Sequence, residues 1–345
     1  MKRSLGYVPA LDGLRALAVA LTIFYHAEVP IAWGGYLGVD MFFVLSGFLI
    51  TTLLLEEIRD TGTISLKNFY VRRALRLYPA LLMMLAVDAL CLPLFPGTGW
   101  DFSKEAPVAG LYLTDYAIGL GFMPILTLVT HTWSLAVEEH FYILWPLALL
   151  GLRRRYPGRK LAPVLAQCWL AATGWKLACI LSGQDWAAVY FRFDSHMSGL
   201  LLGAFLGAWL LEGGKLRWPS WCLPLSAVVT LSCIVAMQPR DVVAPLSIYV
   251  TIPAELFTFF LIAQVMTAPK HASVRWLAWT PLVLVGRISY GLYIFHYAAA
   301  YYMWPKHEWV QTLAVSAAVA AGLASLSWVT VEKAARRFRK RFGRE

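Results

Sequence analysis

The chain has 345 residues, of which 59% are hydrophobic and only 14% are charged. A soluble globular protein carries about 25% charged residues, so this composition argues against a soluble domain and makes lipid the main solvent. The net charge of +10 comes from lysines and arginines in short loops between apolar stretches. That pattern sets orientation in a membrane and argues against nucleic acid as a partner.

Ten apolar segments have roughly the length of about 20 residues that a helix needs to cross a bilayer. In chain order they are 10–30, 36–56, 76–95, 133–152, 161–182, 195–212, 220–238, 244–267, 281–303 and 309–331. The stretch 106–128 is also apolar, but Asp115 and Pro124 interrupt it. We predict a short re-entrant or interfacial segment there, with an eleventh span as the alternative.

The expected fold is therefore an all-α polytopic membrane protein of about ten transmembrane helices. We expect one transmembrane domain over residues 1–345, without an appended soluble domain. Ten spans put both termini on one side, together with the basic loops at 59–76 and 153–160 and the basic segment 333–344. The loops on the other side hold few basic residues, so the positive-inside rule predicts that both termini are cytoplasmic.

The first segment contains two ionisable residues, Arg15 and His26. Such side chains are costly inside a bilayer and often mark functional sites. Eleven residues at 100° each make three turns plus about 20°, so both side chains share one face, about 16 Å apart along the axis. Arg15 is expected near the cytoplasmic end and His26 toward the outer end. Taken alone, Arg15 could equally be an interfacial residue paired with Asp12, and His26 a packing residue.

An arginine cluster precedes the third segment on the cytoplasmic side. Arg76 follows Arg72 and Arg73 by four and three residues, so a helix would bring the three together. Clustered guanidinium groups suit phosphate, although they could also serve only to set topology. With Arg15 they form a predicted cytoplasmic layer of positive charge.

A second layer of polar residues is expected at the outer ends of the segments. Asp40 lies at the level of His26, and His296 lies in the outer half of the segment 281–303. The remaining members begin the segments 133–152 and 195–212 or lie just before them: Trp133, Glu138, Glu139, Arg192, Asp194 and His196. Interfacial salt bridges and helix capping are the alternative explanation for the charged members. A phosphate-bearing donor in the cytoplasm and a hydroxyl acceptor outside would meet these two layers.

With these motifs the chain resembles the membrane-bound acyltransferase 3 family over nearly its whole length. Six motifs occur in order: Leu11–Arg15 with His26, Phe43–Phe48, the cluster of Arg72, Arg73 and Arg76, Trp133–Leu135 with Glu138 and Glu139, Arg192–Asp194, and Ser289–Tyr293 with His296. Each motif is weak alone, but the ordered set is specific. His140 departs from the pattern, since relatives often have glutamine there.

The resemblance implies transfer of an acyl group, usually acetyl, from acyl-CoA to a hydroxyl of a carbohydrate or small molecule, by a multi-pass protein of the bacterial cytoplasmic membrane. It makes His26 the catalytic general base, with Glu138 orienting or stabilising its imidazole. The implied cofactor-binding residues are Arg15, Arg72, Arg73 and Arg76. The expected acceptor-binding residues are Asp40, Trp133, Glu139, Arg192, Asp194, His196 and His296.

Two other functions stay open at this point. A secondary transporter could use the same buried charges as a substrate path, and a lipid-linked sugar flippase could bind a polyprenyl phosphate. We see no internal repeat, which disfavours the repeat-built transporter folds. Direct transfer and a covalent acyl-histidine route are both compatible with the sequence. The five cysteines lack metal-ligand or disulfide spacing, and no metal is predicted.

Overall fold

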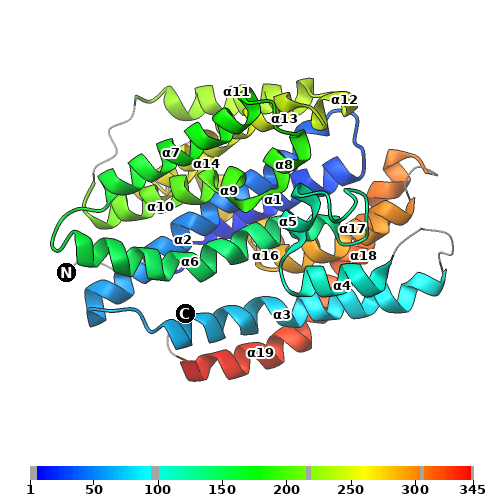
Figure 1. The fold of residues 1–345 in the computed structure, drawn as a ribbon, viewed down its shortest axis with the longest axis horizontal. Helices are drawn as coiled ribbons and strands as arrows, with labels where there is room; N and C mark the ends of the chain where they lie inside the picture. Colours follow the sequence, from blue (N-terminus) through cyan, green and yellow to red (C-terminus); the bar gives the residue numbers. More distant parts are fainter. Residues whose placement is uncertain (1–5, 95–100, 215–218, 304–306, 343–345) are drawn as a thin grey trace.

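The computed structural model describes residues 6–94, 101–214, 219–303 and 307–342 (Figure 1). Over these residues the chain forms helices and loops without a strand. The main helices are α1 Pro9–His26, α2 Leu37–Thr61, α3 Leu66–Cys91, α6 Trp133–Arg155, α7 Ala162–Leu181, α10 Ser198–Leu211, α11 Cys222–Ala236, α14 Thr251–Thr267, α17 Ser289–Met303 and α18 Trp309–Val329. Shorter helices connect or extend them: α4 Phe102–Gly110, α5 Thr114–Gly119, α8 Trp186–Phe191, α9 Phe193–His196, α12 Pro239–Val242, α13 Pro245–Tyr249, α15 Ala272–Arg275, α16 Thr280–Arg287 and α19 Val331–Arg339.

Six helical stretches of the described chain are long and apolar enough to cross a bilayer, and the bent pair α16–α17 would make a seventh. The six fall on the predicted segments 36–56, 76–95, 133–152, 161–182, 244–267 and 309–331. The other predicted segments contain α1 and the shorter α10 and α11. The all-α, multi-pass class is confirmed. The count of ten and the orientation of the termini stay predictions, and both ends of the chain lie partly outside the described residues.

The stretch 106–128 does not form a spanning helix. It begins in α4, which has nine residues, continues through α5, which has six, and ends in a loop before the 3₁₀ turn Thr130–Thr132. Both helices are far shorter than the ~20 residues that a span requires. An eleventh span made of one helix is therefore excluded.

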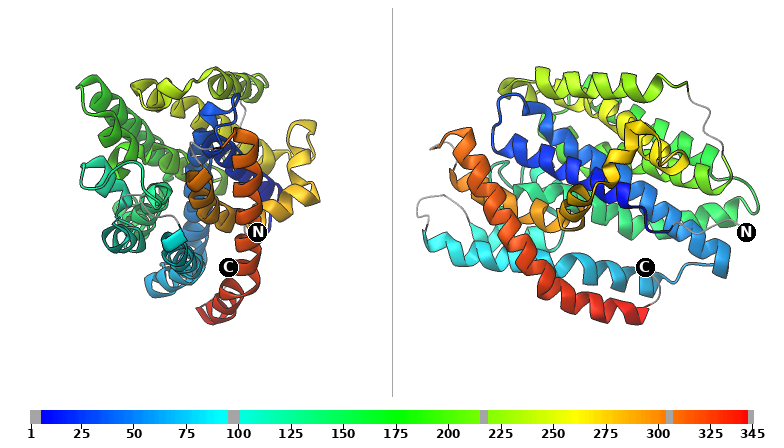
Figure 2. Two further views of the ribbon diagram at one scale, coloured as in Figure 1. Left: turned by 90° about the vertical axis from the view of Figure 1, so that its right-hand side faces the viewer. Right: turned by 180° about the vertical axis from the view of Figure 1, so that it is seen from behind.

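Glycines let the central helices approach closely. A Cβ atom on Gly47 of α2 would lie 1.9 Å from the carbonyl oxygen of Leu200 in α10, and one on Gly203 would lie 1.9 Å from that of Val44. Small residues at helix interfaces commonly allow such backbone contact in membranes. α1 packs beside α2 in this central layer, whereas α3 and α19 lie together along one side of the bundle (Figures 1 and 2).

α16 and α17 hold the Arg15 end of α1. A Cβ atom on Gly286 of α16 would lie 1.8 Å from the carbonyl oxygen of Asp12, so the two backbones touch. The chain then bends by 69° between α16 and α17, and α17 continues along α1. The residues from Ser289 to His296 are thereby brought to the same side of the bundle as Arg15 and His26.

Candidate active site

The imidazole of His26, the last residue of α1, contacts a second histidine from α17. His26 Nδ1 lies 3.0 Å from the backbone carbonyl oxygen of Thr22 and 3.0 Å from Nε2 of His296. His296 is fully buried, and its Nδ1 lies 2.6 Å from the backbone carbonyl oxygen of Tyr293. The structure thus brings together two of the three histidines that the sequence placed in the outer layer, His26 and His296.

These contacts indicate which nitrogen atoms carry protons when both rings are neutral. The Tyr293 carbonyl oxygen can only accept, so His296 Nδ1 carries the proton and its Nε2 has a lone pair. His296 Nε2 then accepts from His26 Nδ1–H, which also faces the Thr22 carbonyl. This assignment follows from the hydrogen-bond pattern and leaves the lone pair of His26 on Nε2. A general base takes its proton through such an atom.

A third histidine and a tyrosine complete the surroundings of His26. The ring of His131 stacks on that of Tyr297, with centroids 4.7 Å apart and an angle of 24° between the planes. Tyr297 in turn contacts the His26 ring edge-on at 4.9 Å, and His131 Nε2 donates to the backbone oxygen of Ile294 at 3.0 Å. Neither His131 nor Tyr297 was predicted as a site residue. The available signal was their position, since His131 lies just before Trp133 and Tyr297 directly follows His296.

A cavity lined by arginines opens beside the other end of α1. It has two adjoining parts, of about 630 Å³ and 1060 Å³ including their solvent-open regions. Arg15, Arg73 and Arg76 line both parts. Arg15 Nη1 binds Asp12 Oδ1 at 2.7 Å. This pairing is the alternative explanation of Arg15 that the sequence left open. The Arg73 guanidinium lies 4.3 Å from the centre of the Tyr142 ring.

Arg72 does not line this cavity. Its Nη1 donates to the backbone carbonyl oxygen of Phe342 at 2.7 Å, and its Nη2 lies 3.9 Å from Glu57 Oε2. Of the four arginines predicted to bind the cofactor, the structure gathers three around the cavity. Arg72 instead ties α3 to the C-terminal segment.

Glu138 lies in the cavity with the arginines and not against His26. Ser46 Oγ donates to Glu138 Oε1 at 2.5 Å, and both residues line the smaller part of the cavity. Its neighbour Glu139 has a buried Oε1 without a hydrogen-bond partner in the described chain. The geometry therefore differs from the predicted pairing of Glu138 with the imidazole, because His296 occupies that position.

Phe42 and Tyr293 stand between the cavity and the histidines. Both line the smaller part of the cavity, and their ring centroids are 6.3 Å apart. The Tyr293 ring lies 5.7 Å from that of His296, and its hydroxyl donates to the His131 carbonyl oxygen at 2.7 Å. The cavity therefore ends at Tyr293, and the ring of His296, whose centroid lies 5.0 Å from that of His26, follows behind it.

Residues 8–331 match the acyltransferase domain of the acyltransferase 3 family. The chain belongs to this family. The O-acetyltransferase OatA of Staphylococcus aureus strain NCTC 8325 is 32% identical over 319 residues, which are 84% of this chain and 50% of the relative. OatA of strain COL matches with the same values. The chain thus spans about half the length of these curated relatives. No solved structure matches it significantly.

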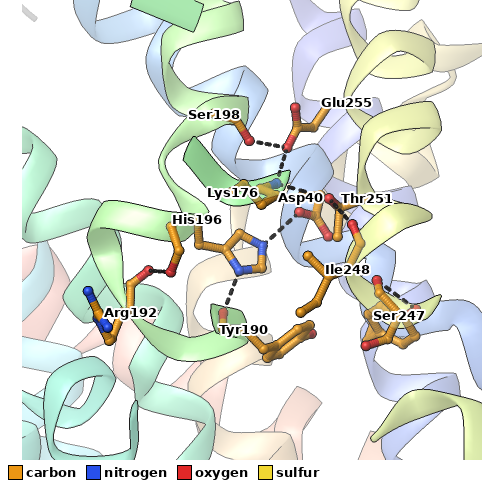
Figure 3. A network of polar contacts seen from close by, with 12 residues as sticks. Asp40, Lys176, Tyr190, Arg192, His196, Ser198, Ser247, Ile248, Thr251 and Glu255 are labelled. Carbon is orange, nitrogen blue, oxygen red and sulfur yellow. Dashed lines mark hydrogen bonds and ion pairs between the residues drawn. The ribbon is translucent and has the colours of Figure 1, made fainter. Parts of the chain in front are cut away.

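In this family member, the predicted acceptor residues Asp40, Trp133 and His196 form a buried group. His196 Nε2 lies 2.9 Å from Asp40 Oδ1, and both side chains are 1% exposed (Figure 3). The ring centroids of Trp133 and His196 are 5.1 Å apart. The residues share one layer, as predicted, but their burial keeps them from an acceptor in this conformation. The pair instead joins α2 to α9.

Arg192 and Asp194 bind each other through two hydrogen bonds, of 2.9 Å from Arg192 Nε and 2.6 Å from Nη2. Trp175 Nε1 also donates to Asp194 Oδ2 at 3.0 Å. This arrangement agrees with the alternative of an interfacial salt bridge. An acceptor-binding role for this pair stays a prediction.

Proposed function

We propose that this protein is an O-acyltransferase of the bacterial cytoplasmic membrane that transfers an acetyl group from acetyl-CoA to a hydroxyl of a carbohydrate or a similar acceptor. One observation carries the proposal: an arginine-lined cavity beside one end of α1 extends toward a histidine, at the other end, whose Nε2 is free to accept a proton. The family and the names of the relatives support acetyl transfer. In this scheme the Arg15 end faces the cytoplasm.

The cavity has the chemistry that a coenzyme A donor requires. Three guanidinium groups can bind phosphate oxygens through charge-assisted hydrogen bonds. The smaller part of the cavity continues from the arginines to Tyr293, in the direction that a pantetheine arm would have to follow. Phe42 and Tyr293 would have to shift for the thioester to reach His26.

His26 would act as the general base. As the acceptor hydroxyl oxygen attacks the thioester carbonyl carbon, His26 Nε2 takes the hydroxyl proton. The carbon–sulfur bond then breaks, and the same nitrogen returns the proton to the departing thiolate. His296 Nε2 accepts a hydrogen bond from His26 Nδ1–H, so it would hold the ring in place and stabilise the transient imidazolium.

Purified protein in nanodiscs, supplied with radiolabelled acetyl-CoA and hydroxyl-bearing acceptors, tests the activity. We expect label on the acceptor and release of free coenzyme A. Solute flux in liposomes without any turnover of acetyl-CoA would instead support a transporter. Binding of polyprenyl phosphate without binding of acetyl-CoA would support a flippase. Mass spectrometry of surface glycans from cells with and without the gene would identify the acceptor.

Arg15→Ala should raise the Kd for acetyl-CoA by about 10-fold or more, because a hydrogen bond to a charged group contributes about 1.5–3 kcal/mol. Arg15→Lys should lose less affinity for acetyl-CoA, since lysine keeps the positive charge. Affinity is measured by equilibrium binding, with the exposed Arg59→Ala as the control. An unchanged Kd in a folded Arg15→Ala protein would remove Arg15 from the donor site.

His296→Ala should lower kcat by about 10- to 100-fold, the range found when partners that orient metal-bound histidines are removed. The KM for acetyl-CoA should hardly change, because His296 lies outside the cavity. His296→Gln should recover part of the loss, since its amide oxygen can accept from His26 Nδ1–H, and should keep the wild-type pH–rate profile. Equal losses in both variants, with both folded, would argue against a positioning role.

A further inference from the structure

α17 begins inside the protein, at the bend that separates it from α16. The first backbone bond of this helix runs from the amide of Leu292 to the carbonyl oxygen of Ile288, at 2.9 Å. The amides of Ser289, Tyr290 and Gly291 precede that bond, so they need partners from outside the helix. Together with the helix dipole, such amides create partial positive charge at a helix N-terminus.

The start of α17 lies at the arginine-lined cavity. Ser289 and Tyr290 line its smaller part together with Arg15, Arg73 and Arg76. Ser289 is only 4% exposed, yet its hydroxyl has no hydrogen-bond partner among the described residues. The hydroxyl oxygen is not one of the fully buried atoms without a partner, and Ser289 lines the cavity. A ligand in the cavity can therefore supply a partner to this hydroxyl.

The charge around this helix start favours an anion. Three arginines face two cavity-lining acids, Asp12 and Glu138, so positive charge is in excess. Asp12 binds Arg15 at 2.7 Å, and Glu138 accepts from Ser46 at 2.5 Å. Discontinuous helices of membrane proteins commonly point a half-helix N-terminus at an anionic group, and phosphate is a frequent ligand at such termini. The 69° bend between α16 and α17 gives this family member a half-helix N-terminus of the same kind.

We propose that the first turn of α17, with the Ser289 hydroxyl, forms a phosphate-binding subsite that works with Arg15, Arg73 and Arg76. The inference rests on the proposed function, and it assigns the diphosphate of the acetyl-CoA donor to this place. The three arginines line both parts of the cavity. A diphosphate bound to Ser289 and the arginines would occupy the arginine end of the smaller part. It leaves the larger part for the nucleotide and the rest of the smaller part for the pantetheine arm.

Binding to protein in nanodiscs made of zwitterionic lipid alone tests the subsite without relying on turnover. Ser289→Asp places a negative charge at the helix start and should weaken acetyl-CoA binding by about 10-fold or more, by repelling the phosphates. Ser289→Ala should weaken it by about 2- to 5-fold, the effect of one lost hydrogen bond. Acetyl-pantetheine, which has no phosphate, should bind all variants as it binds the wild type. Ser220→Asp, at an exposed loop position, is the matched control.

Inorganic diphosphate and an anionic lipid distinguish the source of the phosphate. Diphosphate should compete with acetyl-CoA in the wild type and about 10-fold less effectively in Ser289→Asp. Wild-type affinity for acetyl-CoA in folded Ser289→Asp protein would overturn the subsite while leaving the proposed function intact. A wild-type protein that binds no acetyl-CoA would overturn the proposed function itself. Competition by phosphatidylglycerol but not by diphosphate would show that the subsite binds a lipid headgroup. It would overturn the assignment of the acetyl-CoA diphosphate to this place.

Discussion

His26→Ala should reduce acetyl transfer by at least about 100-fold, since general acid–base catalysis by one positioned side chain contributes about 10²–10⁴-fold. Alanine removes Nε2, the nitrogen that His26 leaves free when its Nδ1–H donates to His296. The measurement is transfer of radiolabelled acetyl to the acceptor by purified protein.

Donor binding separates loss of chemistry from loss of fold in this variant. The arginines lie on the far side of Phe42 and Tyr293 from His26, so His26→Ala should bind acetyl-CoA with nearly wild-type affinity. His271→Ala, at an exposed histidine, should transfer acetyl at the wild-type rate. A folded His26→Ala protein with wild-type transfer would refute the assignment of the base.

The same variant distinguishes direct transfer from a covalent route. In direct transfer, mixing the wild type with labelled acetyl-CoA and no acceptor leaves the protein unlabelled. A covalent route would put label on the imidazole of His26, and His26→Ala would remove it. Rapid acid or base quenching followed by mass spectrometry of the peptide that contains residue 26 gives the answer.

Local periodicity predicted the part of the site that lies on one helix. Arg15 and His26 share a face of α1 because eleven residues make nearly three whole turns, and the structure places Arg15 at the cavity and His26 beyond it. The depth of both residues in the bilayer, inferred from the position of the apolar segment, stays a prediction. Such properties belong to one element and need no knowledge of its neighbours.

Contacts between helices could not be predicted in the same way. His26 and His296 are 270 residues apart, and Glu138 was an equally reasonable partner for His26 because both were expected at one level. Which of the two residues, Glu138 or His296, meets His26 depends on which faces of α6 and α17 turn toward α1. The close contact of Gly286 with Asp12 and the 69° bend before α17 decide it, and neither has a periodic signature in the sequence.

The arginine cluster shows the same limit within a single helix. Arg72 and Arg73 are adjacent, so their side chains point about 100° apart on α3. Arg73 faces Tyr142 and the cavity, whereas Arg72 faces Phe342 and Glu57. A charge count predicts the cluster, but the rotation of α3 against α6 and α19 determines which members can meet a ligand.

Lys176→Met should lower the free energy of unfolding by about 3–5 kcal/mol, the usual effect of removing one partner of a buried ion pair. Lys176 Nζ lies 3.0 Å from Glu255 Oε1 and 3.0 Å from Thr251 Oγ1, and the two charged side chains are 0% and 1% exposed (Figure 3). Ser198 Oγ also donates to Glu255 Oε1 at 2.6 Å. Methionine fills the space of the lysine but leaves this carboxylate buried without its cation.

A double variant shows whether the loss comes from the orphaned charge. Lys176→Met with Glu255→Gln removes both charges and keeps groups that can bond to Ser198 and Thr251, so it should be more stable than Lys176→Met alone. The exposed Lys160→Met should have little effect. Unfolding in mixed micelles with increasing dodecyl sulfate, followed by circular dichroism, measures all three.

The location of the pair separates this loss of stability from a loss of catalysis. Lys176 and Glu255 do not line the arginine-lined cavity, so the folded fraction of Lys176→Met should keep its specific activity. A loss of activity at full stability would mean that the buried charges take part in transfer. A loss below about 1 kcal/mol would mean that water or lipid headgroups reach Glu255 once the lysine is gone, because a carboxylate that stays dry and unpaired costs more than that.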